Sequence, residues 1–492
     1  MQTSSERAFD TLIEGNAYAA LPPAFFVPTA PTPLRDPYLV AVSRDAAREI
    51  GVPVSTFERP HVIRALAGSD PLPGVTPIAA AYAGHQFGSW VPQLGDGRAL
   101  LLGNVRTRDG ALWELQLKGA GETAFSRMGD GRAVLRSTIR EFLCSEAMDA
   151  LGVPTTRALA IVGSDDAVYR ETAETAAVLT RLAPSFVRFG TFEFFFARGD
   201  ADAQRTLADW LIERYFPTLV DAPNRYEAFL CEVVERTART IAHWQSIGFQ
   251  HGVMNTDNMS ILGLTLDYGP FGFMEAYDPD WICNHSDHLG RYRFSAQPSI
   301  GLWNLRVLAA ALEPLVVGAG MTRALERYEP ALRAAYVELC RKKMGLIRWP
   351  DDRYDLLGDL LALMGEEGAD YTLTFRALSS VARSGDAAAF LSSFGGRAAA
   401  AAAWLAQYRD ELGRQGIADE DRLPSMRAVN PAYILRNHLA HVAITRAQQR
   451  DFSEVDRLLA ALRSPFDERP EFDDYAQPAP AWAASLELSC SS

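Results

Sequence analysis

The hydrophobic positions change their period along the chain, and this change separates a strand-rich first part from a helical second part. Two strand-like runs, residues 99–107 and 111–118, are separated by Asp109-Gly110, a dipeptide typical of a hairpin turn. Further strand-like runs cover residues 158–162 and 177–182. The pattern predicts a β-hairpin followed by two more strands.

Helical periodicity first occurs between these strands and then dominates the rest of the chain. Apolar residues from Ile139 to Leu151 recur on one helical face, and Gly152 with Pro154 closes the segment. Helical patterns follow at residues 206–215, 225–247 and 302–463, with no internal repeat. The order of elements predicts a two-lobed α+β fold.

Composition and charge narrow the class of protein. The 492 residues are 48% hydrophobic and 22% charged, which excludes a disordered chain, and the formal charge of −13 gives no overall attraction for nucleic acid or anionic membranes. The longest apolar run, residues 398–406, is far short of the roughly 20 residues that span a bilayer. Five cysteines without a CxxC pair fit a reducing compartment. We expect a cytoplasmic monomer with no nucleic-acid or membrane partner.

Two copies of a Gly-Asp-Gly-Arg sequence are the first candidates for chemistry. Gly95-Asp96-Gly97-Arg98 directly precedes the hairpin, and Gly129-Asp130-Gly131-Arg132 follows it. Glycines let backbone amides approach an anion, and an adjacent Arg can fork onto phosphate oxygens. Each copy alone is more typical of a tight turn.

Lys118 and Glu141 form a second candidate pair. Lys118 ends the second strand of the hairpin, where a lysine is usually a solvated edge residue but could also project into a cleft. Glu141 lies off the apolar stripe of the following helix. Thr138 and Glu141 have the spacing of a capping box, which would occupy the carboxylate locally. Position alone leaves both readings open.

The strongest local signal is HGVMNTDNMSILGLTLDYGP, residues 251–270. Asp257 and Asn258 precede a short strand-like run, residues 261–266, which is followed by Asp267. An Asn oxygen and a carboxylate on either side of a β turn are a recurring way to hold Mg²⁺ against nucleotide phosphates. The segment predicts a magnesium site, with a solvated loop as the alternative.

Taken in order, these pieces resemble the glycine loop, strand Lys, helix Glu, catalytic-loop Asn and metal-binding Asp of protein kinases. One departure concerns the base. Kinases carry an Asp in the H-R-D-x-x-x-x-N loop, and the matching position here is Val253, which cannot accept a proton. Asp257 offers a carboxylate instead, so the chemistry is either lost or altered.

The chain also resembles the selenoprotein O family of kinase-like protein adenylyltransferases. The matching stretches are residues 82–99, 114–148, 251–260, 266–279 and 430–440, and Cys490 stands where some members carry selenocysteine. The resemblance implies that ATP binds flipped, with a buried γ-phosphate. AMP then passes to Ser, Thr or Tyr hydroxyls of protein substrates, and pyrophosphate leaves.

The same resemblance implies a role for individual residues. Asp257 would accept the proton, while Asn258 and Asp267 would hold Mg²⁺ or Mn²⁺. The residues implied to bind ATP are Gly95, Gly97, Arg98, Lys118, Asp130, Gly131, Glu141, Arg181, Arg188 and Asp267. Several arginines suit a buried triphosphate, since their forks neutralise it more specifically than lysines do.

We expect four segments in the chain. These are an N-terminal wrapping extension (1–78), a kinase-like N-lobe (79–190), a kinase-like C-lobe (191–350), and a helical C-terminal extension with a Cys-containing tail (351–492). The resemblance also suggests that Cys490 forms a redox-sensitive disulfide with Cys283, with two independent thiols as the alternative. The cluster of Cys283, His285 and His288 is a weak candidate for zinc, and His85 is expected to be structural.

The sequence is also compatible with three other functions. UTP with Mn²⁺ would use the same phosphate-binding residues and give uridylyl transfer. An ordinary kinase would transfer the γ-phosphate, although Val253 argues against it. A pseudokinase scaffold would bind ATP without turnover.

Overall fold

The hairpin around Asp109-Gly110 lies in the middle of the main sheet. The computed structural model describes residues 9–70, 72–350 and 355–488. In it β6 (Ala99–Arg106) pairs antiparallel with β7 (Leu112–Lys118). Gly110 has a φ of +92° in the connecting turn, a conformation that glycine adopts without strain. The predicted hairpin is confirmed.

The main sheet is antiparallel, with the order β1-β3-β6-β7-β10-β9-β2 and with β8 paired to β10 off this path. Both edge strands, β1 and β2, come from the proline-rich first 78 residues. The predicted strands at 158–162 and 177–182 are confirmed as parts of the longer β9 and β10. The remaining strands of this sheet are β1 (Phe26–Pro28), β2 (Tyr38–Val42), β3 (Ile78–Ala80), β8 (Ala133–Val134), β9 (Arg157–Tyr169) and β10 (Ala173–Ala183).

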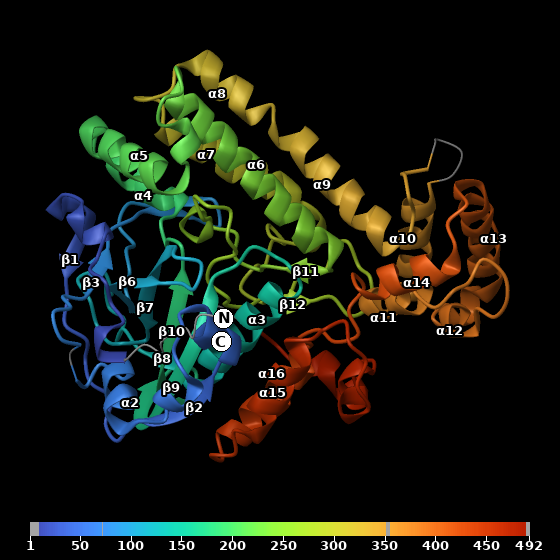
Figure 1. Ribbon diagram of the computed structural model, residues 1–492, viewed down its shortest axis with the longest axis horizontal. Helices are drawn as coiled ribbons and strands as arrows, with labels where there is room; N and C mark the ends of the chain where they lie inside the picture. Colours follow the sequence, from blue (N-terminus) through green and yellow to red (C-terminus); the bar gives the residue numbers. More distant parts are fainter. Residues whose placement is uncertain (1–8, 71, 351–354, 489–492) are drawn as a thin grey trace, which may run out of the picture.

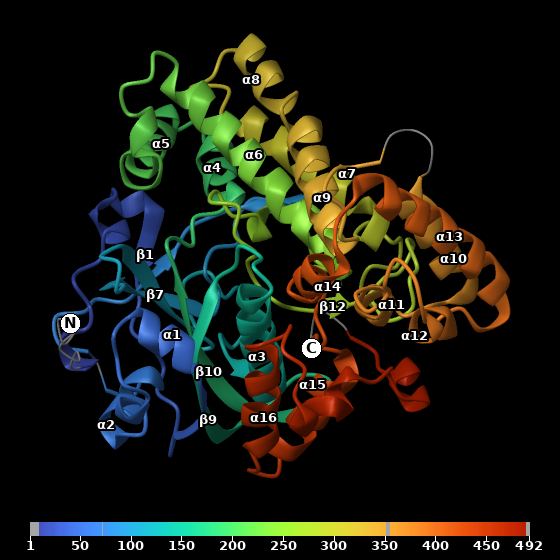
Figure 2. The same ribbon diagram turned by 45° about the vertical axis from the view of Figure 1, so that its right-hand side comes forward.

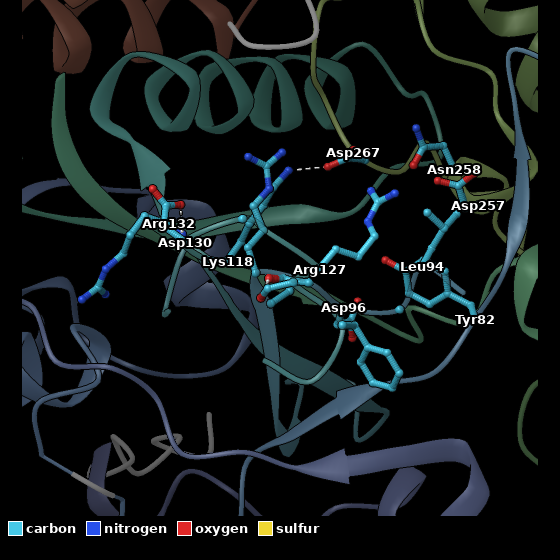
Figure 3. A pocket seen from close by; sticks show the side chains of 18 of the residues that line it. Tyr82, Leu94, Asp96, Lys118, Arg127, Asp130, Arg132, Asp257, Asn258 and Asp267 are labelled. Atoms are coloured by element: carbon cyan, nitrogen blue, oxygen red, sulfur yellow. Dashed lines mark hydrogen bonds and ion pairs between the residues drawn. The ribbon is translucent and has the colours of Figure 1, made fainter. Parts of the chain in front are cut away.

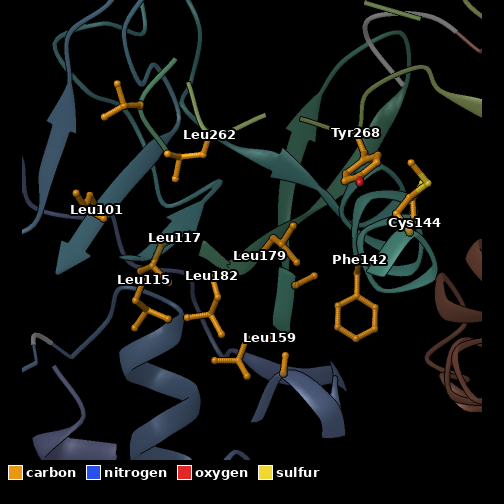
Figure 4. Packing of buried hydrophobic residues seen from close by; sticks show 14 of the residues in the cluster. Leu101, Leu115, Leu117, Phe142, Cys144, Leu159, Leu179, Leu182, Leu262 and Tyr268 are labelled. Atoms are coloured by element: carbon orange, nitrogen blue, oxygen red, sulfur yellow. The ribbon is translucent and has the colours of Figure 1, made fainter. Parts of the chain in front are cut away.

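Helix α3 (Leu135–Ala150) packs against the sheet through the predicted apolar face. Figure 4 shows Phe142 and Cys144 of this helix near Leu159 and Leu179 of the strands. The capping box, one of the two alternatives for Glu141, does not form, because α3 begins at Leu135 and places Thr138 inside the helix. The Thr138 hydroxyl donates to the Val134 carbonyl (2.8 Å), so the Glu141 carboxylate serves another purpose.

Helices make up most of the chain beyond β10, as the sequence predicts. Figure 1 shows α4 to α9 together on one side of the sheet, with the long helices α6 and α9 running side by side. The predicted helices at 206–215 and 225–247 are confirmed as α5 and α6. These helices are α4 (Phe189–Phe196), α5 (Ala201–Tyr215), α6 (Arg225–Ser246), α7 (Gln297–Ala311), α8 (Gly318–Leu325) and α9 (Tyr328–Lys343).

The C-terminal helices form two groups. Helices α10 (Leu356–Glu367), α11 (Tyr371–Leu378), α12 (Ala388–Ser392), α13 (Ala398–Gln415) and α14 (Asp419–Arg427) enclose a hydrophobic cluster of their own. Helices α15 (Asn437–Ala447) and α16 (Ser453–Leu462) return to pack on α3, as Figure 2 shows. No helix in the described part of the chain is long and apolar enough to cross a membrane.

The polar segment after α6 consists mainly of loops, interrupted by the short strands β11 (Phe249–Gln250) and β12 (Gly272–Phe273). The strand-like run at 261–266 is not a strand. Gly263 has a φ of +72°, and the backbone around it bonds to two separate segments, with Ile261 N donating to Val187 O and Thr265 N to Pro154 O. This run therefore anchors the loop between Asn258 and Asp267 to its surroundings.

Candidate active site

A cavity of about 360 Å³ lies between the sheet and the loop that follows α6. Figure 3 shows Lys118 on one side of it, with Asp267, Asn258 and Asp257 on the loop opposite. All of the predicted site residues except Glu141 line this cavity, and Glu141 lines an adjoining cavity of about 240 Å³. The structure therefore brings the predicted residues together from seven segments spread over residues 95–267: Gly95–Arg98, Lys118, Asp130–Gly131, Glu141, Arg181–Arg188, Asp257–Asn258 and Asp267.

Four charged side chains form an ion cluster at the floor of the site, and three of them, Lys118, Glu141 and Arg181, are buried. Lys118, at the end of β7, contacts Glu141 of α3 (2.5 Å) and also Asp267. Arg181 of β10 donates to the other Glu141 oxygen (3.0 Å) and lies 3.8 Å from Asp267. The hairpin, α3 and β10 thus each contribute one charge, and the tertiary fold rather than a local cap engages Glu141.

Asp267 has two unusual features. Its φ is +63°, in the left-handed region that non-glycine residues rarely adopt. Burial by itself would raise the pKa of its carboxyl, but Lys118, Arg98 and Arg181 outweigh that effect and hold the pKa well below its usual range. Asp267 is therefore ionised at neutral pH and suited to binding a cation.

The two Gly-Asp-Gly loops pack closely with the segment between them. A Cβ on Gly95 would lie 2.3 Å from the Phe125 ring, and Gly95 also has a φ of +73°. A Cβ on Gly131 would lie 2.1 Å from the Gly121 backbone. These glycines are required by close backbone approach, which keeps amide groups at the cavity wall.

Asp130 and Arg188 are each held by a partner. Arg170, in the turn between β9 and β10, binds the Asp130 carboxylate through two nitrogens, each at 2.8 Å. Arg188 precedes α4 and donates to the Asp257 carbonyl (3.0 Å), while its guanidinium lies 4.4 Å from the centre of the Tyr82 ring. Arg188 therefore links the cavity wall to the loop that carries Asp257.

Asp257 lies in a single 3-10 turn, Thr256–Asn258. Its Oδ2 accepts a hydrogen bond from Gln86 Nε2 (3.1 Å), whereas its buried Oδ1 has no partner among the described residues. Burial raises the pKa of Asp257 to about 6, although Gln86 and Arg188 act in the opposite direction. Such a carboxyl is suited to accepting a proton near neutral pH.

Asn258 and Asp267 fit a divalent cation. The Asn258 amide nitrogen donates to the Val253 carbonyl (3.1 Å), which leaves the amide oxygen as the end that can bind a metal. The described residues include no group of three His, Cys, Asp or Glu side chains that could hold a metal ion, so these two oxygens would need phosphate oxygens as further ligands. The same finding leaves Cys283, His285 and His288 without a metal site.

The loop after Asp267 meets the C-terminal tail. The Cys283 thiol donates to the Pro270 carbonyl (2.9 Å), and the His285 amide donates to the Leu488 carbonyl (2.8 Å). Cys490, the predicted partner of Cys283, lies outside the described residues.

Sequence reasoning missed three residues that support the site. Gln116 accepts from Arg181 Nε (3.1 Å) and donates to Asp96 (3.4 Å), Arg170 holds Asp130, and Gln86 binds Asp257. Gln116 is two residues before Lys118 on the same strand, so the two side chains point to the same face of the sheet. This spacing could have identified Gln116 from the sequence. Gln86 and Arg170 gave no such signal, because their partners are distant in sequence.

Comparisons with known proteins agree on one family. The family model described as "Protein adenylyltransferase SelO" matches residues 9–463. A protein nucleotidyltransferase YdiU of Thiobacillus denitrificans is 52% identical over 486 residues, covering 98% of this chain and 99% of that protein. Proteins of the same name from Myxococcus xanthus (51% identical, 100% of both chains) and Yersinia pseudotuberculosis (50% identical, 97% and 98%) are also similar.

Proposed function

The chain belongs to the SelO family of protein nucleotidyltransferases, and from this premise we propose that it transfers AMP from ATP to Ser, Thr and Tyr hydroxyls of other proteins. The observation that carries the proposal is the convergence of Lys118, Arg98 and Arg181 around Asp267, with Asp257 on the opposite side of one cavity. This arrangement provides cations for a triphosphate and a carboxylate for an acceptor hydroxyl.

We propose further that the fold is kinase-like and two-lobed, with the nucleotide flipped relative to an ordinary kinase. The order of elements supports this proposal, because the hairpin, α3 and the loop after α6 supply Lys118, Glu141 and Asp267 in the kinase order. Val253, at the position of the kinase base, has no proton-accepting side chain. A flipped nucleotide would explain this, since the reacting phosphorus then lies at a different place.

In the proposed reaction the acceptor oxygen attacks the α-phosphorus. A new oxygen–phosphorus bond forms, the bond from the α-phosphorus to the bridging oxygen breaks, and pyrophosphate leaves. Asp257 takes the hydroxyl proton, and Arg98, Arg181 and Arg188 stabilise the phosphate charge. A divalent cation held by Asn258 and Asp267 would neutralise charge on the phosphates and help orient them.

The tail contact supports a redox-sensitive disulfide between Cys283 and Cys490. The His285 amide donates to the carbonyl of Leu488, which is two residues before Cys490 in the sequence, and His285 is two residues after Cys283. Oxidation by a disulfide such as oxidised glutathione would join the two thiols and restrain the loop after Asp267. We expect transfer activity and gel mobility to change with reductant in the wild type but not in Cys490→Ser. Equal behaviour of the two proteins would contradict the disulfide.

Mass spectrometry tests the proposed transfer and its rivals in one experiment. The protein is incubated with Mg²⁺ or Mn²⁺, casein as a generic acceptor, and either ATP or UTP, and the acceptor is then analysed. Added AMP is expected with ATP. Added UMP as the main product would favour uridylyl transfer, added phosphate an ordinary kinase, and an unmodified acceptor and enzyme would contradict catalysis and favour a scaffold.

A further inference from the structure

We propose that a small hairpin outside the main sheet positions the loop that carries Asp257, called the catalytic loop below (residues 251–260). We propose also that Gln86 of this hairpin orients the carboxylate of Asp257. The hairpin consists of β4 (Gly84–Gln86) and β5 (Ser89–Val91), which pair only with each other. The proposal rests on the proposed function, in which Asp257 accepts the proton of the acceptor hydroxyl. Gln86 is a positioning residue in this account, because it acts through Asp257.

Three consecutive hairpin residues bond to three consecutive residues of the catalytic loop. The His85 amide donates to the Thr256 hydroxyl (2.7 Å), and the Phe87 amide donates to the Asn255 side-chain oxygen (3.0 Å). Between them, Gln86 Nε2 donates to Asp257 Oδ2 (3.1 Å). The two hydrogen bonds from backbone amides fix the position of the hairpin relative to the loop. The Gln86 side chain is therefore held at a fixed place beside the Asp257 carboxylate.

The other side of the hairpin is attached to helix α4. The His85 ring nitrogen Nδ1 lies 2.6 Å from the Glu193 carboxylate, and its ring packs against Trp90 and Trp303 at centroid distances of 5.1 and 5.5 Å. The Ala83 amide, just before the hairpin, donates to a carbonyl of the same helix. The hairpin is thus attached to α4 through His85 and Ala83, and this attachment fixes its position relative to the loop.

Gly84 allows the two backbones to approach closely enough for this contact. A Cβ at this position would lie 2.6 Å from Asp257 Oδ1 and 2.9 Å from the Asp257 Cβ. The aspartate side chain therefore occupies the space that any larger residue at 84 would need. Gly84 limits the carboxylate on one side, Gln86 binds its Oδ2, and Arg188 holds the Asp257 carbonyl, so the carboxylate is held in a single orientation.

The test is substitution Gln86→Met, which keeps the length of the side chain and removes its amide donor. Transfer of label from α-labelled ATP to casein is followed with Mg²⁺ present. We expect kcat to fall about tenfold, because misplacing a catalytic group by a fraction of its contact distance slows a reaction strongly. KM for ATP and the thermal midpoint should not change. The matched control is Ser89→Ala, which alters an exposed side chain on the other strand of the hairpin and should leave kcat unchanged.

Two further variants separate positioning from structural support. Gln86→Glu keeps the shape but replaces the amide donor with a second carboxyl group beside Asp257, whose charge disfavours ionised Asp257, and it should lower kcat as Gln86→Met does. In an Asp257→Asn background, which retains the triphosphate contacts and a slow residual transfer, Gln86→Met should change the rate by less than about twofold.

An unchanged kcat in Gln86→Met would overturn the proposal. So would a raised KM with an unchanged kcat, or an equal loss in the Asp257→Asn background. Absence of label transfer by the wild type would instead contradict the proposed function, which distinguishes the two failures.

Discussion

Lys343, the last residue of α9, is a buried lysine whose pKa should make the free energy of unfolding depend on pH. The residue is 5% exposed, its ammonium donates to the Ser246 carbonyl at the end of α6, and it lies 4.0 Å from the centre of the Phe375 ring. Burial lowers the pKa of Lys343 from 10.5 to about 8. The folded chain therefore carries this charge at neutral pH in an environment that disfavours it.

The sign and size of the effect follow from this pKa. Between about pH 8 and 10.5 the folded state binds fewer protons than the unfolded state, so the free energy of unfolding rises with pH across this window. The gap between 10.5 and about 8 corresponds to about 3 kcal/mol, of which about 2 kcal/mol is gained between pH 7 and about pH 9.5. Lys343→Met should therefore stabilise the protein by up to about 1 kcal/mol near pH 7, after the loss of one hydrogen bond and of the contacts of the ammonium with the Tyr371 and Phe375 rings. The Ser246 carbonyl keeps a bond from the Tyr371 hydroxyl (3.1 Å).

Urea unfolding, followed by tryptophan fluorescence at pH 7 and about pH 9.5, measures this effect. The difference between wild type and Lys343→Met should change by about 2 kcal/mol between the two pH values. Lys342→Met is the matched control, because the neighbouring side chain is 52% exposed and should show no such change. Wild-type and Lys343→Met stabilities that stay parallel with pH would refute the reasoning.

Other predictions concern the site and its frame. Asp267→Asn should weaken Mg²⁺-dependent ATP binding at least about tenfold, and a chelator should abolish transfer by the wild type; unchanged affinity in titration calorimetry would remove Asp267 from the metal site. Asp257→Asn should spare ATP binding and slow transfer by roughly 10²–10⁴, so a wild-type rate would show that the base lies elsewhere. Gly190→Ala should destabilise the protein by about 1–3 kcal/mol, because its Cβ would lie 2.0 Å from the Ala83 carbonyl oxygen, and an unchanged thermal midpoint would count against this close contact.

Sequence patterns predicted two kinds of element correctly: those marked by a specific turn sequence, and those in which an apolar period repeats over several turns. The hairpin was predicted from a turn dipeptide between two apolar runs, and α3 from a stripe that continues over four turns. The run at 261–266 misled because a six-residue apolar segment fits a strand, a helix or a buried turn. Its backbone partners, Val187 and Pro154, could not be inferred from the run itself.

The sequence predicted those site residues whose types follow one another in the order known from kinases. It did not predict contacts between residues that only the folded chain brings together. Lys118, Glu141 and Asp267 follow the kinase order, but sequence left Glu141 between a capping box and an ion pair. The ion pair forms because α3 begins at Leu135 and the carboxylate reaches Lys118 across the sheet. Gln86 and Asp257 are separated by 171 positions, and only the packed hairpin brings them together.

The most direct test of nucleotidyl transfer compares ATP labelled on the α-phosphate with ATP labelled on the γ-phosphate. The purified protein is incubated with each in the presence of Mg²⁺ or Mn²⁺ and casein, and the label retained on protein is counted. We expect that α-label is retained on protein and that γ-label is released with pyrophosphate. Retention of γ-label with loss of α-label would contradict it and would indicate an ordinary kinase with a relocated base.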